Sequence, residues 1–110
     1  MNAKSVLDRI KGGLIVSVQA DDNEPLGKPE ILAAMAKAVE LGGACAIRSC
    51  YPKNTIAIRN AVSIPVIGIY KKKYLDSEVF IGATLADNLE IVETGCEIVA
   101  FDATQRERPN

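Results

Sequence analysis

Apolar residues gather in four short runs along the chain, and turn-forming residues bound each run. The runs cover residues 14–19 (LIVSVQ), 44–49 (ACAIRS), 65–71 (PVIGIYK) and 97–103 (EIVAFDA). Short runs that are apolar nearly throughout are typical of strands covered on both faces in a parallel sheet. We therefore expect four buried strands.

The segments between these runs have the period of amphipathic helices. The first dozen residues predict a short helix, and a longer one is expected to begin near Pro29 and end at Gly42 and Gly43. A third helix follows Pro52, and a fourth covers the segment 84–95. The long helix and the last helix each have a distinct apolar face, formed by Ile31, Ala34, Met35, Ala38 and Leu41 and by Leu85, Leu89 and Val92 respectively.

Strands that alternate with helices indicate βαβ units, and hence the α/β class. Two joints, VELGGACAIR and VETGCEIVAF, both run from a helix through glycine into a strand, as repeated units would. An open doubly wound sheet and part of a (β/α)8 barrel both satisfy this pattern. The first strand is not followed by G-x-G-x-x-G, and there is no P-loop motif, so the nucleotide-binding versions are disfavoured.

Composition excludes several classes of partner. The 110 residues are 48% hydrophobic and 25% charged, with a net charge of −1, which is typical of one ordinary soluble domain. The charges give no basic surface for nucleic acid and no polybasic signal for a membrane, and no apolar run is long enough to span a bilayer. The first residues lack the apolar core of a secretory signal, so we expect a cytoplasmic protein.

The chain has no histidine, and its three cysteines have no C-x-x-C spacing. Neither a disulfide framework nor a metal site is therefore expected. Acid–base chemistry would fall to lysine, aspartate, glutamate or tyrosine.

Polar side chains end all four predicted strands: Gln19, Arg48, Lys71 and Asp102. In parallel α/β sheets the C-terminal ends of the strands form the edge at which ligands bind. Strand alternation gives Lys71 a definite face, while Lys72 and Lys73 fall in the following loop and are expected in solvent. The alternative is that these polar residues only mark where strands meet water.

Alternation also separates small side chains from bulky ones. Ser17 shares a face with Gln19, as Ala46 does with Arg48 and Ala100 with Asp102, whereas the opposite faces carry larger residues. A small-residue face that ends in polar groups suits the interior of a barrel. Arg48 and Asp102 could equally form a structural ion pair.

Several longer stretches resemble one known family. They are KGGLIVSVQADDNEPLGKPEILAAMAKAVELGGACAIR, IPVIGIYKKKYLDSEVFI and VAFDATQRERP, which lie in this order within residues 9–109. The chain thereby resembles the N-acetylmannosamine-6-phosphate 2-epimerase family. The resemblance implies a cytoplasmic (β/α)8 barrel that uses no cofactor. It also implies interconversion of the 6-phosphates of N-acetylmannosamine and N-acetylglucosamine in sialic acid breakdown.

The resemblance also implies roles for single residues. Lys71 corresponds to the family's catalytic lysine, which removes the C2 proton of the open sugar to give an enediolate. The positions that match substrate contacts or a shared motif beside them are Gln19, Arg48, Asp102, Arg106 and Arg108. No residue is expected to bind a metal.

A typical (β/α)8 barrel needs about 250 residues, so this chain matches only its first four β/α units. We expect residues 1–110 to form one incomplete domain, a half-barrel truncated after the fourth strand. The resemblance implies that the carboxylate partner of the lysine and the phosphate-binding loops belong to the family's later half. A missing C-terminal half, or a second copy in a homo-oligomer, would then have to cover the open interior.

Three hypotheses follow. The chain is part of an epimerase that acts on a phosphosugar, or it is a catalytically inactive half-barrel, such as a fragment or the remnant of an interrupted gene. A small flavodoxin-like binding domain ranks third. It would need an acidic cluster at the end of the first or third strand, and the sequence has none there.

Overall fold

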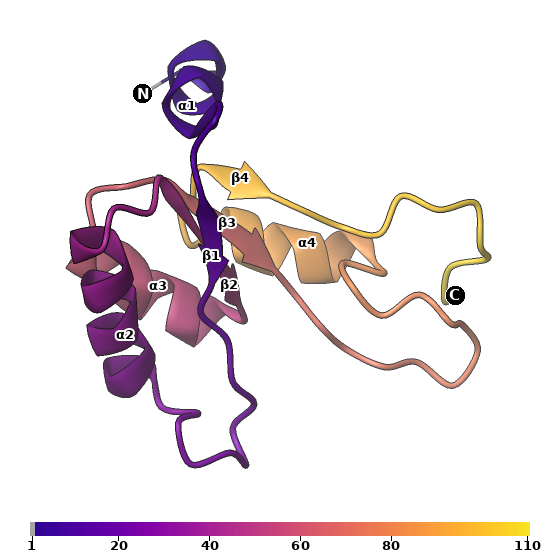
Figure 1. Ribbon diagram of the computed structural model, residues 1–110. Helices are drawn as coiled ribbons and strands as arrows, with labels where there is room; N and C mark the ends of the chain where they lie inside the picture. Colours follow the sequence, from indigo (N-terminus) through magenta and orange to yellow (C-terminus); the bar gives the residue numbers. More distant parts are fainter. Residues whose placement is uncertain (1) are drawn as a thin grey trace.

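Helices and strands alternate in the computed structural model, which describes residues 2–110. The helices are α1 (Ala3–Ile10), α2 (Pro29–Leu41), α3 (Pro52–Ala61) and α4 (Leu85–Val92) (Figure 1). The strands are β1 (Ile15–Ser17), β2 (Ala46–Cys50), β3 (Val66–Ile69) and β4 (Ile98–Val99). No helix among residues 2–110 has the length and apolar character needed to cross a bilayer.

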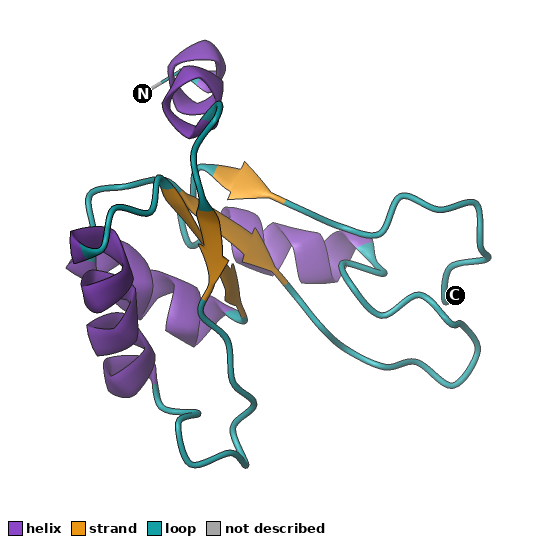
Figure 2. Cartoon of the chain, viewed as in Figure 1, coloured by secondary structure: helices purple, strands orange, loops and turns teal. Residues whose placement is uncertain are grey.

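The four strands form one parallel sheet in the order β1-β2-β3-β4. Helices α2, α3 and α4 lie on one side of the sheet, and α1 lies at the end where the strands begin (Figure 1). Long loops leave the C-terminal ends of β1 and β3, and the segment after β4 extends beside the second of these loops (Figure 2). The predicted α/β class and the four strands are confirmed.

The assigned strands are shorter than the apolar runs that predicted them. The pairing nevertheless continues at single bonds, because the Val18 N–H donates to the Arg48 carbonyl at 3.0 Å. After β3 the partner changes, and the Gly82 N–H donates to the Tyr70 carbonyl at 2.8 Å. The end of the third run therefore pairs with its own following loop.

The hydrophobic core lies between the sheet and its helices. The buried residues of this core are Val18, Ala20, Leu32, Ala36, Ile47, Ile58 and Val66. Gly68 belongs to the same face of β3, where an added Cβ would lie 2.6 Å from Ile91 Cγ2. The bulky faces of β1 and β2 thus pack under helices, as strand alternation predicts, whereas β3 turns Val66 and Gly68 toward the helices.

The apolar faces expected on α2 and α4 are not the faces that pack on the sheet. Leu41 of α2 is 78% exposed and Leu85 of α4 is 74% exposed, whereas Leu32 and Ile91 are fully buried. Both helices carry apolar residues on more than one side, so periodicity does not reveal which side meets the sheet. Since α2 and α4 are the outer helices of the layer, each has an apolar side that no described residue covers.

The other face of the sheet has no helix on it (Figure 1). Ile15 is 42% exposed on this face, and Ser17 is also exposed. Ile67 and Ile98 are half-buried at the same level, because the register places Ser17, Arg48, Ile67 and Ile98 side by side. This open face, called the inner face below, carries Ser17 and Arg48 but also three isoleucines, so it has the small and polar character expected of a barrel interior only in part.

Candidate functional site

Gln19 and Arg48 both belong to the inner face. Arg48 lies in β2, directly opposite Ser17 of β1 and Ile67 of β3, and its side chain is half-buried. Gln19 follows β1, and its Nε2 donates to Ser17 Oγ at 2.7 Å. The Arg48 guanidinium has no hydrogen-bond or ion-pair partner within residues 2–110. A half-buried cation without a partner is available to an anionic or polar ligand.

Lys71 lies just beyond β3, two residues after Ile69, and is half-buried. Its backbone forms an isolated antiparallel bridge with Ile81, whose carbonyl accepts from the Asp102 N–H at 2.9 Å. Arg48 lies opposite Ile67, and Lys71 follows Ile67 by four residues. At the usual rise of a strand, the Lys71 backbone therefore lies about 13 Å beyond the level of Arg48. Lys71 therefore stands at the mouth of the inner face rather than within it.

A hollow of about 400 Å³ opens at this position. Its lining residues are Asp21, Tyr51, Lys71, Lys72, Lys73 and Phe80. Lys72 and Lys73 are exposed, as the sequence predicts, yet they also border the hollow. The hollow consequently combines three cationic side chains with two aromatic rings and one carboxylate.

Cys50, the last residue of β2, lies opposite Ile69 and one pleat below Lys71. Burial raises the pKa of the Cys50 thiol, and the backbone N–H and the charge of Lys71 act in the opposite direction. A thiol whose pKa is raised stays protonated at neutral pH and is a poor nucleophile. Cys50 is therefore a wall of the site, consistent with its being only 2% exposed.

Tyr51 has an uncommon backbone conformation, with φ of 74° and ψ of 148°. It is the only residue other than glycine with a positive φ among residues 2–110. A bulky side chain rarely adopts this region, and the cost is about 1–3 kcal/mol when it does. Such strain at a strand end is a feature of functional sites, and here it lets β2 turn directly into α3 at Pro52.

We expect Tyr51→Gly to be more stable than Tyr51→Ala by about 1 kcal/mol, because glycine adopts a positive φ without steric cost. Neither variant retains the ring, so the comparison isolates the backbone. Urea unfolding of both variants measures the difference. Ala57→Gly within α3 is the matched control and should be destabilising by about 1 kcal/mol. A Tyr51→Ala variant as stable as Tyr51→Gly would contradict the strain.

The ring and hydroxyl of Tyr51 connect three segments. Its hydroxyl donates to Asp21 Oδ1 at 3.3 Å, and its ring packs edge-on against Tyr70 with centroids 5.9 Å apart. Burial raises the pKa of Tyr51, and the nearby Cys50 and Asp21 raise it further. The hydroxyl therefore remains a donor throughout the neutral range, and it links the loop after β1 to the ends of β2 and β3.

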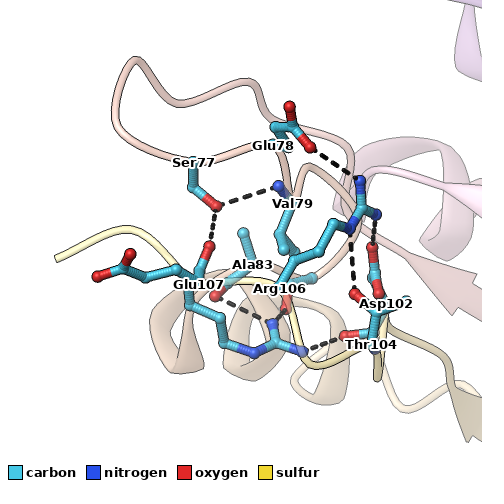
Figure 3. A network of polar contacts seen from close by, with 10 residues as sticks. Ser77, Glu78, Val79, Ala83, Asp102, Thr104, Arg106 and Glu107 are labelled. Atoms are coloured by element: carbon cyan, nitrogen blue, oxygen red, sulfur yellow. Dashed lines mark hydrogen bonds and ion pairs between the residues drawn. The ribbon is translucent and has the colours of Figure 1, made fainter.

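Asp102 and Arg106 form a polar network with the loop between β3 and α4 (Figure 3), and Arg108 donates to backbone carbonyls of the same loop. Arg106 Nη2 contacts Asp102 Oδ2 at 2.5 Å, and Arg106 also pairs with Glu78 at 3.8 Å. The Thr104 N–H is the main cause of the lowered pKa of Asp102, to which Arg106 also contributes. Asp102 is therefore paired with Arg106 rather than with Arg48.

Arg108 is bound to backbone carbonyls. Its Nη1 donates to the carbonyls of Gly82 at 3.1 Å and Ala83 at 3.2 Å, and its Nη2 donates to the Asp102 carbonyl. The Ser77 hydroxyl adds a bond to the Glu107 carbonyl at 2.6 Å (Figure 3). In this structure Arg108 joins the segment after β4 to the loop that follows Lys71. Its substrate-binding role stays a prediction.

The predicted site residues thus fall into two groups. Gln19 and Arg48 lie on adjacent strands of the inner face, while Asp102, Arg106 and Arg108 make up the network after β4. Within the described residues, Lys71 is linked to the second group through the Ile81 backbone. Sequence reasoning missed Tyr51 and Asp21, and the one available signal was an aromatic residue directly before Pro52 at a strand end.

No cluster of three or more histidine, cysteine, aspartate or glutamate side chains suited to a metal ion occurs within the described range 2–110. The three cysteines are free thiols. The polar groups of the site are amines, guanidinium groups and carboxylates. Amines and carboxylates can transfer protons, and amines and guanidinium groups can bind anions.

Comparison with known proteins identifies the group to which this architecture belongs. Residues 32–110 match the family model described as "Putative N-acetylmannosamine-6-phosphate epimerase". The chain belongs to this epimerase family. Relatives named "Putative N-acetylmannosamine-6-phosphate 2-epimerase" include proteins from Listeria innocua, 54% identical over 106 residues, and Enterobacter sp. (strain 638), 53% identical over 107 residues. These alignments cover 96% and 97% of this chain but only 46% of each relative.

The solved N-acetylmannosamine-6-phosphate 2-epimerase from Clostridium perfringens has the same fold. It superposes with a TM-score of 0.93 at 41% identity, over 99% of this chain and 48% of the other. The chain therefore spans about half the length of the epimerases it matches. Its four-stranded sheet corresponds to half of a (β/α)8 barrel, which confirms the predicted fold class.

Proposed function

We propose that this chain provides the proton-abstracting half of an epimerase site that interconverts N-acetylmannosamine 6-phosphate and N-acetylglucosamine 6-phosphate. The observation that carries the proposal is the position of Lys71, half-buried in a hollow at the C-terminal ends of the strands. Catalytic residues of (β/α)8 barrels come from this edge. The family relationship supports the substrate, and sialic acid degradation is the process in which this reaction would serve.

The chemistry requires a base beside C2. In the open-chain sugar the C2–H bond is adjacent to the C1 aldehyde, so the neutral amine of Lys71 takes the proton and leaves an enediolate. The lysine then carries a positive charge, which stabilises the developing anion in a site screened from water. Return of a proton to the opposite face of C2 inverts the centre. Gln19 and Arg48, on the inner face below Lys71, would contact the sugar.

We expect the 110-residue chain to be inactive by itself. The inner face is open, and the described hollow holds one carboxylate, Asp21, which accepts from the Tyr51 hydroxyl. The acid that returns the proton and the groups that bind the phosphate would come from the other half of the barrel. A phosphosugar bound to this half alone would also remain in contact with water, which weakens every polar interaction.

Mixing the chain with the remaining half of the Listeria innocua relative tests this proposal. We expect no epimerisation by either piece and measurable conversion by the mixture, followed by NMR of the two sugar phosphates. A matched control replaces the chain with its Lys71→Ala variant. Full activity of the chain alone would contradict the half-site. A mixture that associates yet converts nothing would contradict the assigned reaction.

A further inference from the structure

The loop that follows β3 comes back to pair with the chain after β4. Up to Ala100 that chain pairs with β3 itself, since the Ala100 N–H donates to the Gly68 carbonyl at 3.0 Å. Two residues later the Asp102 N–H donates to the Ile81 carbonyl at 2.9 Å. Residues 80–82, called the return segment below, have thus replaced β3 as the pairing partner at this level.

The return segment is also the pairing partner of Lys71. Lys71 forms an isolated antiparallel bridge with Ile81. Both neighbours of Lys71 bond to the same segment: the Gly82 N–H donates to the Tyr70 carbonyl at 2.8 Å, and the Lys72 N–H donates to the segment's first carbonyl at 2.9 Å. The position of the Lys71 backbone therefore depends on where the return segment lies.

Arg108 joins the end of the return segment to the chain after β4. Its Nη1 donates to the carbonyls of Gly82 and Ala83, at 3.1 and 3.2 Å. Its Nη2 donates to the Asp102 carbonyl, and its guanidinium carbon lies 5.6 Å from the centre of the Phe101 ring. Three of the five N–H donors of the guanidinium are thus used on backbone carbonyls, and both terminal nitrogens are engaged by the protein itself. This arrangement favours a structural grip over a contact with a substrate phosphate.

Gly82 lets the return segment approach its surroundings closely. Its φ is 58°, and an added Cβ would lie 2.5 Å from Phe101 Cβ and 2.3 Å from Asn88 Oδ1. The Gly82 carbonyl accepts from Asn88 Nδ2 at 3.0 Å as well as from Arg108. Because a carbonyl oxygen has two lone pairs, these two donors satisfy it fully and fix the segment at this residue.

We propose that Arg108 is a positioning residue of the epimerase site and acts on Lys71 through the return segment. The inference rests on the proposed function and deepens it, because it gives Arg108 a part in placing the base. The base must lie within hydrogen-bond reach of the proton it removes. A misplacement of about 1 Å can cost about 100-fold in rate, so a guanidinium that fixes the segment paired with Lys71 has a direct effect on kcat.

Amide hydrogen exchange of the 110-residue chain tests the grip without any activity. We expect Arg108→Gln to speed exchange of the Gly82 and Lys72 amides by about tenfold or more relative to the amides of β2, since local stability sets these rates. Arg59→Gln is the matched control, because Arg59 of α3 also donates to a backbone carbonyl, that of Thr94 at 3.2 Å. It should leave both amides unchanged. Unaltered exchange in Arg108→Gln would overturn the proposal.

Steady-state kinetics separate positioning from substrate binding. In the chain assembled with the remaining half of the Listeria innocua relative, we expect Arg108→Gln to lower kcat by about 10- to 100-fold and to leave KM within about threefold. Arg108→Lys should lose nearly as much, because an ammonium lacks the planar fork that reaches separate carbonyls. Arg59→Gln should keep the kcat of the parent.

A raised KM with unchanged kcat in Arg108→Gln would overturn the proposal in favour of a substrate contact. Full activity of Arg108→Lys would overturn it too, since charge alone would then suffice. An assembled parent that converts nothing contradicts the proposed function, whereas unaltered amide exchange contradicts the grip of Arg108. The two failures are therefore distinguishable.

Discussion

Replacing Lys71 by alanine in the assembled enzyme is expected to lower kcat by about 100- to 10,000-fold, the range that a general base contributes. The Lys71 amine lines the hollow at the end of β3, and strand alternation gives it a definite face. Alanine leaves no base at this position. Steady-state conversion, measured by NMR of both sugar phosphates, gives the ratio.

Lys72→Ala and Lys73→Ala are the matched controls, because all three lysines border one hollow. Both are exposed loop residues, so we expect kcat within about threefold of the parent, with any effect confined to KM. Circular dichroism of each variant separates loss of chemistry from loss of fold. An equal loss of kcat in Lys72→Ala would show that a general positive field, rather than one base, carries the reaction.

Leu32→Ala should lower the free energy of unfolding by about 2–5 kcal/mol, the range for truncating a fully buried leucine. Leu32 is 0% exposed and packs in the core between α2 and the sheet. Truncating the side chain would leave a cavity, and the neighbouring side chains can fill it only in part because the sheet holds their backbone in place. Urea denaturation followed by far-UV circular dichroism measures the change.

Leu41→Ala in the same helix is the control, with the same side chain removed at a position that is 78% exposed. We expect a change within about 0.5 kcal/mol, as for most surface substitutions. A larger loss at Leu41 than at Leu32 would mean that the opposite side of α2 packs on the sheet. The two variants therefore determine which apolar side of α2 forms the core.

Much of the fold could be predicted because strands and helices obey different periods. Four apolar runs gave four parallel strands, and alternation put Val18 under the helices and Ser17 on the open face. The same argument separated Lys71 from the two lysines that follow it. These predictions depend only on local geometry, which a sequence specifies residue by residue.

Features that depend on tertiary contacts could not be predicted. The apolar faces of α2 and α4 gave no indication of which side meets the sheet, since both sides are apolar. Arg108 is bound by carbonyls of residues 82 and 83, which no sequence pattern places beside it. The positive φ of Tyr51 likewise arises from how β2 turns into α3.

The central claim is that Lys71 of this half-barrel moves the C2 proton. Incorporation of solvent deuterium at C2 tests this claim most directly. The assembled enzyme is incubated with N-acetylmannosamine 6-phosphate in D2O, and the C2 proton signal of the product is followed by NMR. The account predicts a product that carries deuterium at C2, and no incorporation above background with Lys71→Ala. A product that retains its original C2 proton, or incorporation that persists undiminished in Lys71→Ala, would contradict it.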